Sequence, residues 1–448
     1  MIAEPVGRRL GVVAMLAAAA GVVLGGAGSG GDGAFAPQVL RIDGERLIAN
    51  LQRLATFGAT PEGGTSRLAY SEEDLAARRF VAELMEAAGL EVSVDLAGNL
   101  IGRRVGADPS LPPIMLGSHI DSVPDGGNYD GQVGSIGALE VAQTLADAGV
   151  VTRHPLEIVI FQNEEGGKTG SRVLIGEVEA YELDVVTASG LTIGDGTRAL
   201  GGDPTRLAEA RRQPGSIAAF LELHIEQGAV LQRQGIDIGV VEGIVGIKRW
   251  NVTVRGFANH AGTTPMEARR DALVAAARFI LAVEQVASSM SGRQVATVGR
   301  LAVSPGAPNV IPGEVALSLE IRDLEMDKID AVRAAIGERA ETIAANSGVT
   351  ISFEPFYVSY AAPTDQRLRE LIAESAAELG LTSLAMPSGA GHDAQSIAVL
   401  APAGMIFVPS IDGISHSPRE HSEPAAIIAG ANVLLRTLLR LDAEGLER

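Results

Sequence analysis

The spacing of hydrophobic residues changes along the chain, and each pattern predicts a different kind of structure. Between residues 43 and 224, stretches with apolar residues at helical spacing, as at Leu47, Leu51 and Leu54, alternate with short apolar runs. The first pattern is typical of helices with one buried face and the second of buried strands. Helices are expected at 43–54, 75–85 and about 136–148, and strands at 114–116, 156–161 and 220–224. This alternation predicts an α/β fold, a mostly parallel mixed sheet flanked by helices.

A second pattern begins near Gly246. The run IKRWNVTVRG alternates between apolar and polar residues, which is typical of a half-exposed strand. Further strands are expected at 294–301, 316–322 and 350–356, with helices at 270–286 and 326–345. They would form a small α+β domain. Because the first pattern returns with a helix at about 365–379 and a strand at 405–409, the smaller domain is expected to be inserted into the larger one. Residues 37–245 and 361–448 would then be the two parts of the larger domain, and 246–360 the insertion.

The first 36 residues differ from the rest in composition. Arg8 and Arg9 precede an apolar run from Leu10 to Leu24, and a Gly/Ser stretch leads to the small residues Ala34 and Ala36. This order is typical of an export signal of the twin-arginine type, and the apolar run is short for a membrane span. We expect a signal-like segment at 1–36 that directs export. A disordered extension or a mis-assigned start codon, which would leave the protein in the cytoplasm, is the alternative.

Composition excludes several classes of partner and chemistry. The chain of 448 residues carries a net charge of -19, which argues against binding to nucleic acid or to an anionic membrane surface. It contains no cysteine, so disulfides, thiolate catalysis and Cys-based zinc sites are excluded. Any bound metal must therefore be held by His, Asp and Glu side chains.

Clusters of polar residues follow the strands predicted for the larger domain. They are GSHIDSVPDGGNYDG from Gly117, NEEGG from Asn163, LHIEQG from Leu223, GAGHDA from Gly389 and GISHSPRE from Gly413, and they hold four of the seven histidines. Ligands of such sheets bind beyond the carboxyl ends of the strands, so these clusters are expected to meet. His119 and Asp121 would point to the same face of an extended chain, where the carboxylate could orient a metal-binding imidazole.

The same motifs, together with GFANHAGTTPMEARRDA and PNVIPG, occur in an order that resembles the peptidase M20 group of metal-dependent amidohydrolases. The resemblance is to its hydantoinase/carbamoylase branch, which includes N-carbamoyl-L-amino-acid hydrolases, allantoate amidohydrolases and ureidopropionase-like enzymes. It extends over nearly the whole chain after about Ile42. The segment GGKTG, Gly166 to Gly170, departs from the pattern, because many relatives have an arginine and a phenylalanine there. The side chain that the substrate pocket prefers is therefore left open.

The resemblance implies a larger catalytic domain that holds two divalent metal ions per subunit. The implied ligands are His119, Asp130, Glu165, His224 and His416. Asp130 would bridge the two ions, with His119 and His224 on one side and the other two ligands on the other. Glu164 would be the general base and acid, and Asp121 would support the ligand His119. Since every ligand is an N or O donor, zinc is the expected metal, and manganese, cobalt or nickel would also fit.

The resemblance also implies residues that bind the substrate. His260 would donate to the developing oxyanion, Arg322 would bind a substrate carboxylate, and Gln227, Asn309 and His392 would be further contacts. An ordinary ion pair with Asp323 or Glu325 is the alternative for Arg322. The insertion would form a homodimer and reach the partner's site, and the strand at 247–255 is expected to be the exposed edge that pairs across the two-fold axis.

These expectations together predict an enzyme that cleaves the ureido C–N bond of an N-carbamoyl-L-amino acid, a small ureido carboxylate. Allantoate is the alternative substrate, with ureidoglycolate and β-ureidopropionate as related ones. A dipeptidase is a more distant enzymatic possibility. A non-catalytic solute-binding protein on the same scaffold is the alternative from another class, and it would be expected to lack a ligand or Glu164, both of which this chain retains.

Overall fold

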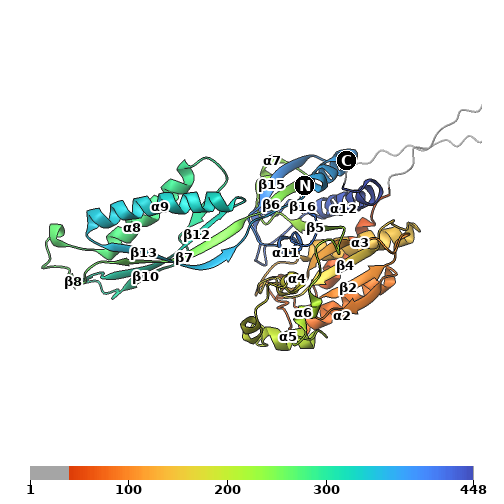
Figure 1. Cartoon of the computed structure of the whole chain (residues 1–448), viewed down its shortest axis with the longest axis horizontal. Helices are drawn as coiled ribbons and strands as arrows, with labels where there is room; N and C mark the ends of the chain where they lie inside the picture. Colours follow the sequence, from red (N-terminus) through yellow and green to blue (C-terminus); the bar gives the residue numbers. More distant parts are fainter. Residues whose placement is uncertain (1–39, 447–448) are drawn as a thin grey trace, which may run out of the picture. The chain divides into compact units, whose positions relative to one another are not determined.

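The computed structural model describes residues 40–446, so the signal-like segment predicted at 1–36 lies outside the described residues. Within the described part, nine strands form one large sheet in the order β1-β2-β4-β3-β5-β16-β6-β14, with β15 also paired to β6 (Figure 1). The strands are β1 (Glu91–Val94), β2 (Leu100–Arg104), β3 (Ile114–His119), β4 (Leu156–Phe161), β5 (Ala219–Ile225), β6 (Ile238–Ile244), β14 (Ala362–Pro363), β15 (Ser383–Ser388) and β16 (Ala403–Val408).

The centre of this sheet is parallel and its margins are antiparallel. Neighbours in the run β4-β3-β5-β16 pair in parallel, as do β6 and β15, whereas β1, β2 and β14 join by antiparallel pairing and β6 pairs antiparallel with β16. The predicted α/β class is confirmed. The carboxyl ends of the four central strands consequently lie along one edge of the sheet.

Helices cover both faces of the large sheet. They are α1 (Gly44–Leu54), α2 (Glu72–Ala87), α3 (Gln132–Asp147), α4 (Thr169–Ile175), α10 (Gln366–Glu378), α11 (Asp393–Ile397) and α12 (Pro424–Glu444). On one face Met115 and Phe220 pack with Leu174 of α4 and Ile397 of α11. On the other, α3 and α12 contact β5. There the side chain of Leu223 packs against Gly137 of α3 and Gly430 of α12. A Cβ added to Gly137 or Gly430 would lie only 2.9 or 2.7 Å from this side chain, so glycine at these positions allows the close packing.

Local sequence explains where the first helix begins. Asp43 accepts a hydrogen bond from the backbone N–H of Arg46 at 3.0 Å, which satisfies one free donor of the first turn of α1. Leu47, Leu51 and Leu54 are all buried, as their helical spacing predicts. The short helices α5 (Ile193–Ala199), α6 (Leu207–Ala210) and α7 (Val230–Gln234) lie in the connections and were not predicted.

A second sheet has five strands in the order β10-β12-β7-β13, with β9 also paired to β12. Its strands are β7 (Gly246–Arg255), β9 (Val295–Thr297), β10 (Leu301–Ser304), β12 (Glu314–Asp323) and β13 (Thr350–Ser359). The chain enters this sheet between Ile244 and Gly246 and leaves it between Ser359 and Ala362. The division of the chain into domains stays a prediction.

Two details of the second sheet correct the expectations from sequence. The strand at 247–255 is not an edge, because β7 pairs with β12 on one side and β13 on the other. Its alternating pattern arises because only one face of the strand is covered. The strand predicted at 294–301 is two strands, β9 and β10, which pair with different parts of β12.

Helices α8 (Ala272–Ser289) and α9 (Met326–Ser347) pack together on the second sheet. Phe279 and Val283 of α8 are buried against Val252 and Leu317 of the sheet and Ile336 of α9. By length and composition α8 and α12 could each cross a membrane, a test that core helices of soluble proteins also pass. Beyond these helices a two-stranded sheet joins β8 (Asn259–His260) to β11 (Val310–Ile311).

Candidate active site

Five side chains that could bind metal ions meet at the carboxyl edge of the large sheet. His119 ends β3, His224 is the sixth residue of β5, Glu165 follows β4, and His416 follows β16. Asp130 lies in the loop between β3 and α3. The structure thus brings together residues that are almost 300 positions apart, because β4, β3, β5 and β16 are neighbours in the sheet.

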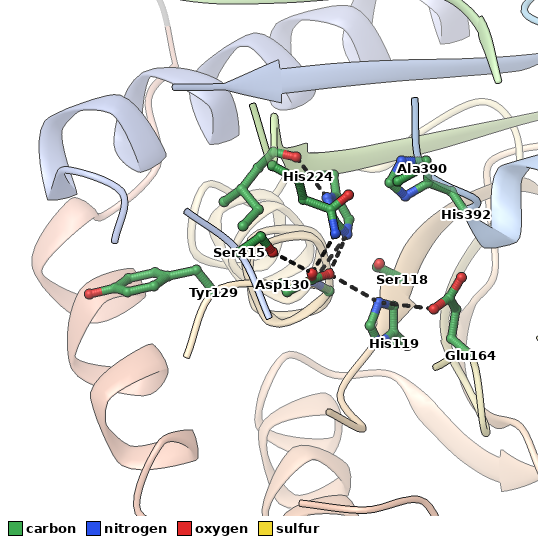
Figure 2. Close-up of polar contacts among 12 residues, drawn as sticks. Ser118, His119, Tyr129, Asp130, Glu164, His224, Ala390, His392 and Ser415 are labelled. Carbon is green, nitrogen blue, oxygen red and sulfur yellow. Dashed lines mark hydrogen bonds and ion pairs between the residues drawn. The ribbon is translucent and has the colours of Figure 1, made fainter. Parts of the chain in front are cut away.

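The carboxylate of Asp130 lies between two groups of ligand atoms. Figure 2 shows its contacts with His119 and His224 of the first group. Its Oδ1 is 3.1 Å from Nε2 of His224 and 3.7 Å from Nε2 of His119. Its Oδ2 is 3.3 Å from Nε2 of His416, which is itself 3.5 Å from Oε2 of Glu165. Bonds of about 2.0 to 2.1 Å in a tetrahedral arrangement separate two ligand atoms by about 3.3 Å. The five side chains therefore fit a pair of metal ions that share Asp130.

The orientation of two histidine rings suits this arrangement. The Nδ1–H of His119 donates to the backbone carbonyl of Asp121 at 3.0 Å, and that of His224 donates to the carbonyl of Ile225 at 2.8 Å. A ring whose Nδ1 carries the proton keeps its lone pair on Nε2, the atom that faces Asp130. Both rings are nearly completely buried, so their positions are fixed by packing.

Asp121 supports the site differently from the expectation. Its carboxylate is 3.6 Å from Nδ1 of His119, and the ring bonds instead to the backbone carbonyl of the same residue. The carboxylate oxygens accept the backbone N–H groups of Glu164 at 3.2 Å and of Glu165 at 3.1 Å. The difference arises because β3 ends at His119, so the two side chains do not continue along an extended strand. Asp121 thus fixes the turn that carries both glutamates.

The carboxylates of the site are buried close to one another, and this disfavours the charged forms of Glu164 and Glu165. Burial raises the pKa of Glu164 to about 7, and burial together with the charges of Asp130 and Glu164 raises the pKa of Glu165 to about 8. Burial acts in the same direction on Asp130, but hydrogen bonds with His224 and His416 hold its pKa well below the usual value. Divalent cations would relieve this crowding of negative charge.

Several residues of the site adopt a strained backbone conformation. Seven described residues other than glycine have a positive φ, and four of them are Asn163, Lys168, Gln227 and His416, with φ between 52° and 57°. Non-glycine residues rarely adopt this region, and where they do the surrounding structure must hold them. The strain therefore gathers in the loops that present the ligands.

Two buried glutamates that sequence reasoning did not single out hold the loops in place. Oε1 of Glu420 accepts the backbone N–H groups of Tyr129 at 2.9 Å and Asp130 at 3.1 Å, and Oε2 accepts the hydroxyl of Ser415 at 2.7 Å. Glu420 stands in the motif GISHSPRE, so its place beside His416 was a usable signal. Glu222, in β5, accepts the hydroxyl of Ser118 at 2.7 Å, and its apolar surroundings in sequence gave no signal.

A cavity of about 330 Å³ opens in front of the ligands and receives side chains from the second sheet. Gln227 and Arg322 line it, whereas His260, Asn309 and His392 are not among the lining residues. His392 lies behind the cavity, where its Nε2 is 2.7 Å from the hydroxyl of Ser388 and its ring packs edge-on against His224 with centroids 4.5 Å apart. The structure therefore places His392 as a support for His224.

His260 and Asn309 lie together on the two-stranded sheet. His260 pairs with Val310 across β8 and β11, and the N–H of Ala261 donates to the carbonyl of Asn309 at 3.0 Å. The side chain of His260 is exposed. The structure of the single chain brings these two residues together but does not bring them into the cavity.

Comparison with known proteins places this site in a family. Residues 115–440 match the model of peptidase family M20/M25/M40. The N-carbamoyl-L-amino acid amidohydrolase of Geobacillus stearothermophilus is 42% identical over 89% of this chain and 99% of its own length. The allantoate amidohydrolase of Escherichia coli is 34% identical over 89% of this chain and 98% of its own.

A solved structure has the same fold. The amidase of the hydantoinase/carbamoylase family from Burkholderia multivorans superposes with a TM-score of 0.84 and 37% sequence identity, and the match covers 90% of this chain and 99% of that one.

Proposed function

The chain belongs to peptidase family M20/M25/M40, and from this premise we propose that it hydrolyses the ureido C–N bond of N-carbamoyl-L-amino acids. The products are the free amino acid, carbon dioxide and ammonia. The observation that carries the proposal is the position of Asp130, whose two oxygens face two separate groups of ligand atoms at 3.1 to 3.7 Å. The names of the similar proteins point to a non-peptide C–N bond as the target.

Two divalent metal ions, with zinc expected, are the proposed cofactors. His119 and His224 would hold one ion and Glu165 and His416 the other, with Asp130 shared. When bound, such a pair acidifies water and polarises the carbonyl under attack. The donors are all imidazole nitrogens and carboxylate oxygens, which also accept manganese, cobalt or nickel.

Glu164 is the proposed general base and acid. Its Oε2 lies 3.7 Å from Nε2 of His119, and its backbone is fixed by Asp121, so the carboxylate stays next to the ligands without being one of them. Without metal ions, burial raises its pKa to about 7. Beside the proposed ions the charged form is favoured, and the carboxylate could accept a proton from the attacking water and pass it to the leaving nitrogen.

Arg322 and Gln227 are the proposed contacts to the substrate. The Nε–H of Arg322 donates to Glu320 at 2.7 Å, and Nη1 donates to the carbonyl of Gly389 at 2.6 Å. These bonds orient the guanidinium toward the cavity, where it would bind the α-carboxylate. Neither Asp323 nor Glu325 forms the alternative ion pair with Arg322 among the described residues. The Oε1 of Gln227 is buried and has no hydrogen-bond partner among residues 40–446, so it could accept a hydrogen bond from a ureido N–H.

We further propose that residues 246–360 act as a dimerisation domain and that His260 and Asn309 serve the site of the partner subunit. Neither residue lines the cavity in its own chain. Asn309 accepts the backbone N–H of Ala261, and two backbone N–H groups donate to Nδ1 of His260. That contact leaves the other ring nitrogen available for a substrate oxyanion. Since β7 is an interior strand, the free edge of β13 replaces it as the candidate for pairing between subunits.

Ammonia release from a panel of N-carbamoyl-L-amino acids tests the proposal. The purified protein is loaded with zinc or manganese, and its turnover of the panel is compared with its turnover of allantoate. Allantoate is included because one relative, similar over 98% of its own length, is an allantoate amidohydrolase. Turnover of the carbamoyl panel above that of allantoate supports the proposal, and the reverse order favours the alternative. No turnover of any member of the panel would contradict it. A simple dipeptide serves as the control for peptidase activity.

A further inference from the structure

Lys168 presents a positive charge to the cavity. It precedes α4 in the loop after β4, and its side chain is half-buried and lines the cavity with Glu164 and Arg322. The ammonium donates a hydrogen bond to the side-chain oxygen of Gln395, a neutral group. A Cβ built on Gly391 would lie 3.5 Å from Nζ, so the ammonium rests against this glycine.

Within the described part of the chain, no carboxylate oxygen lies within 4.0 Å of the ammonium of Lys168. The ion pairs of residues 40–446, taken at up to 4.0 Å, do not include it, although Glu164 lines the same cavity. The other cations of the cavity differ, because Arg249 and Arg322 share Glu320 at 2.5 and 2.7 Å. One carboxylate thus partly neutralises two guanidinium groups, whereas the ammonium hydrogen-bonds to an amide and interacts with the carboxylate of Glu164 only at longer range. A half-buried ammonium that bonds directly only to a neutral amide can form a stronger, charge-assisted bond to an anionic ligand.

The backbone of Lys168 adopts a strained conformation that glycine could adopt without strain. Its φ is 56°, in the left-handed region, although Gly166 and Gly167 directly precede it. Glycine would adopt this conformation without the steric cost of a Cβ. A lysine at this position therefore carries a conformational cost, as is typical of residues in functional sites.

The position of Lys168 relative to Arg322 defines the anion it could bind. Arg322 donates to the carbonyl of Gly389, while the ammonium of Lys168 rests against Gly391 in the same loop. The Cα atoms of residues two positions apart are separated by at most about 7 Å. One small molecule with two carboxylates separated by a few carbon atoms could therefore contact both cations.

We propose that Lys168 makes the pocket selective for ureido substrates with a second carboxylate, the N-carbamoyl derivatives of aspartate and glutamate. The proposal rests on the function proposed above and assigns its substrate class. Arg322 binds the α-carboxylate, and Lys168 exchanges its bond with Gln395 for a charge-assisted bond to the side-chain carboxylate.

Substrates of equal shape and different charge test the selectivity. N-carbamoyl-L-aspartate is compared with N-carbamoyl-L-asparagine, and N-carbamoyl-L-glutamate with N-carbamoyl-L-glutamine, by kcat/KM for release of the carbamoyl nitrogen. Formation of the free amino acid is followed by chromatography, so that ammonia from a side-chain amide does not interfere. We expect the acid of each pair to be preferred by about tenfold or more, because a charge-assisted bond replaces a neutral one. Equal rates for acid and amide would overturn the proposal.

Variants of Lys168 test whether this residue is the cause. Lys168→Met should reduce the ratio of kcat/KM for the acid substrate to kcat/KM for the amide substrate to near one. Lys168→Arg should keep most of this ratio, because the positive charge remains. Lys328→Met is the matched control, since that ammonium donates to the carbonyl of Ser291 and does not line the cavity. If Lys168→Met leaves this ratio unchanged, including by lowering kcat/KM equally for acid and amide, the assignment of Lys168 is overturned.

The same measurements separate this proposal from the one on which it rests. If the wild-type protein cleaves none of the carbamoyl substrates, neutral or acidic, the proposed function itself fails. If it cleaves neutral and acidic members alike, the function stands and the selectivity fails.

Discussion

The imidazole ring of His119 lies against the Cα of Gly131, where an added Cβ would come within 2.4 Å of the ring atoms Cε1 and Nε2. Gly131 has a φ of 77° and stands between Asp130 and the first residue of α3. A side chain here would be strained by the backbone angle and would also occupy the place of a proposed ligand. Gly131 thus lets helix α3 begin directly beside the proposed metal site.

Gly131→Ala is expected to displace His119 and to weaken the binding of only the ion that His119 would hold. The metal content, measured by plasma mass spectrometry after dialysis, should fall from two ions toward one per chain, and activity should fall with it. The ion between Glu165 and His416 should remain, because the atoms nearest the added Cβ all belong to His119.

Gly149→Ala is the matched control for this substitution. Gly149 follows the same helix with a φ of 63°, but no atom lies within 4 Å of the added Cβ. Its cost is limited to backbone strain of about 1 kcal/mol, and its metal content should equal that of the wild type. Equal metal loss in both variants would contradict the role given to Gly131.

Glu164→Gln and Glu165→Gln should differ in the property they lose. The first removes the proposed base and should lower kcat by about 100-fold to 10,000-fold while two metal ions remain bound. The second removes a proposed ligand that lies 3.5 Å from His416, so metal content should fall as well as activity. In both variants the backbone N–H groups of residues 164 and 165 can still donate to Asp121, so the two variants can be compared directly. Unchanged turnover in Glu164→Gln would contradict the role of Glu164 as general base and acid.

Removal of metal should destabilise the protein as well as inactivate it. Asp130, Glu164 and Glu165 are buried near one another, and cations offset their repulsion. Ions present at 100 times their dissociation constant would stabilise the folded state by about 2.7 kcal/mol for each site. Dialysis against a chelator should therefore lower the midpoint of thermal unfolding, and zinc or manganese should restore it. A midpoint independent of metal would contradict the ligand assignment, and chelator presaturated with magnesium is the control.

Asp74 should make the stability depend on pH in a direction opposite to that of most carboxylates. Burial raises its pKa from 3.8 to about 6, with Arg78 opposing the shift. The folded state therefore binds the proton more tightly than the unfolded state, and stability is lost as the pH rises from about 4 to about 7. About two pKa units at 1.36 kcal/mol each amount to about 3 kcal/mol.

The neutral variant Asp74→Asn removes this titration. Between pH 4 and pH 7 the unfolding free energy of Asp74→Asn should rise by about 3 kcal/mol relative to the wild type, as measured by urea titration at each pH. Glu73→Gln changes an exposed neighbour in the same turn of α2 and should not reproduce the trend. A pH-independent difference for Asp74→Asn would show that the carboxyl does not titrate in this range.

Two inactive variants should restore activity to each other if the sites are shared between subunits. His260→Ala removes a residue proposed to serve the partner's site, and Glu164→Gln a residue of the chain's own site. A mixed dimer would have one site with both defects and one intact site. Co-expression in equal amounts should therefore recover about a quarter of the wild-type activity, since half of the dimers are mixed. No recovery, with mixed dimers detected by two affinity tags, would contradict a shared site.

The sequence by itself determined the α/β class and the candidate residues of the site. Helical and strand patterns are local properties, so α1 and β4 occur where the spacing of Leu47 and its neighbours, and the run at 156–161, predict them. His119 and His416 could be selected because histidines are few and stand in glycine-rich motifs.

Only the tertiary structure decided the relations that depend on pairing between distant segments. The alternating run at 247–255 is the same for an edge strand and for an interior strand with one covered face, and the pairing of β7 with both β12 and β13 made it interior. Asp121 binds the turn of Glu164 and Glu165 because the neighbouring strands β3 and β4 bring their loops together. Lys168 meets Gln395 because helix α4 packs against helix α11. Local spacing encodes which face of an element is apolar, but the packing of the whole chain decides which element covers that face and which charged side chains meet in the cavity.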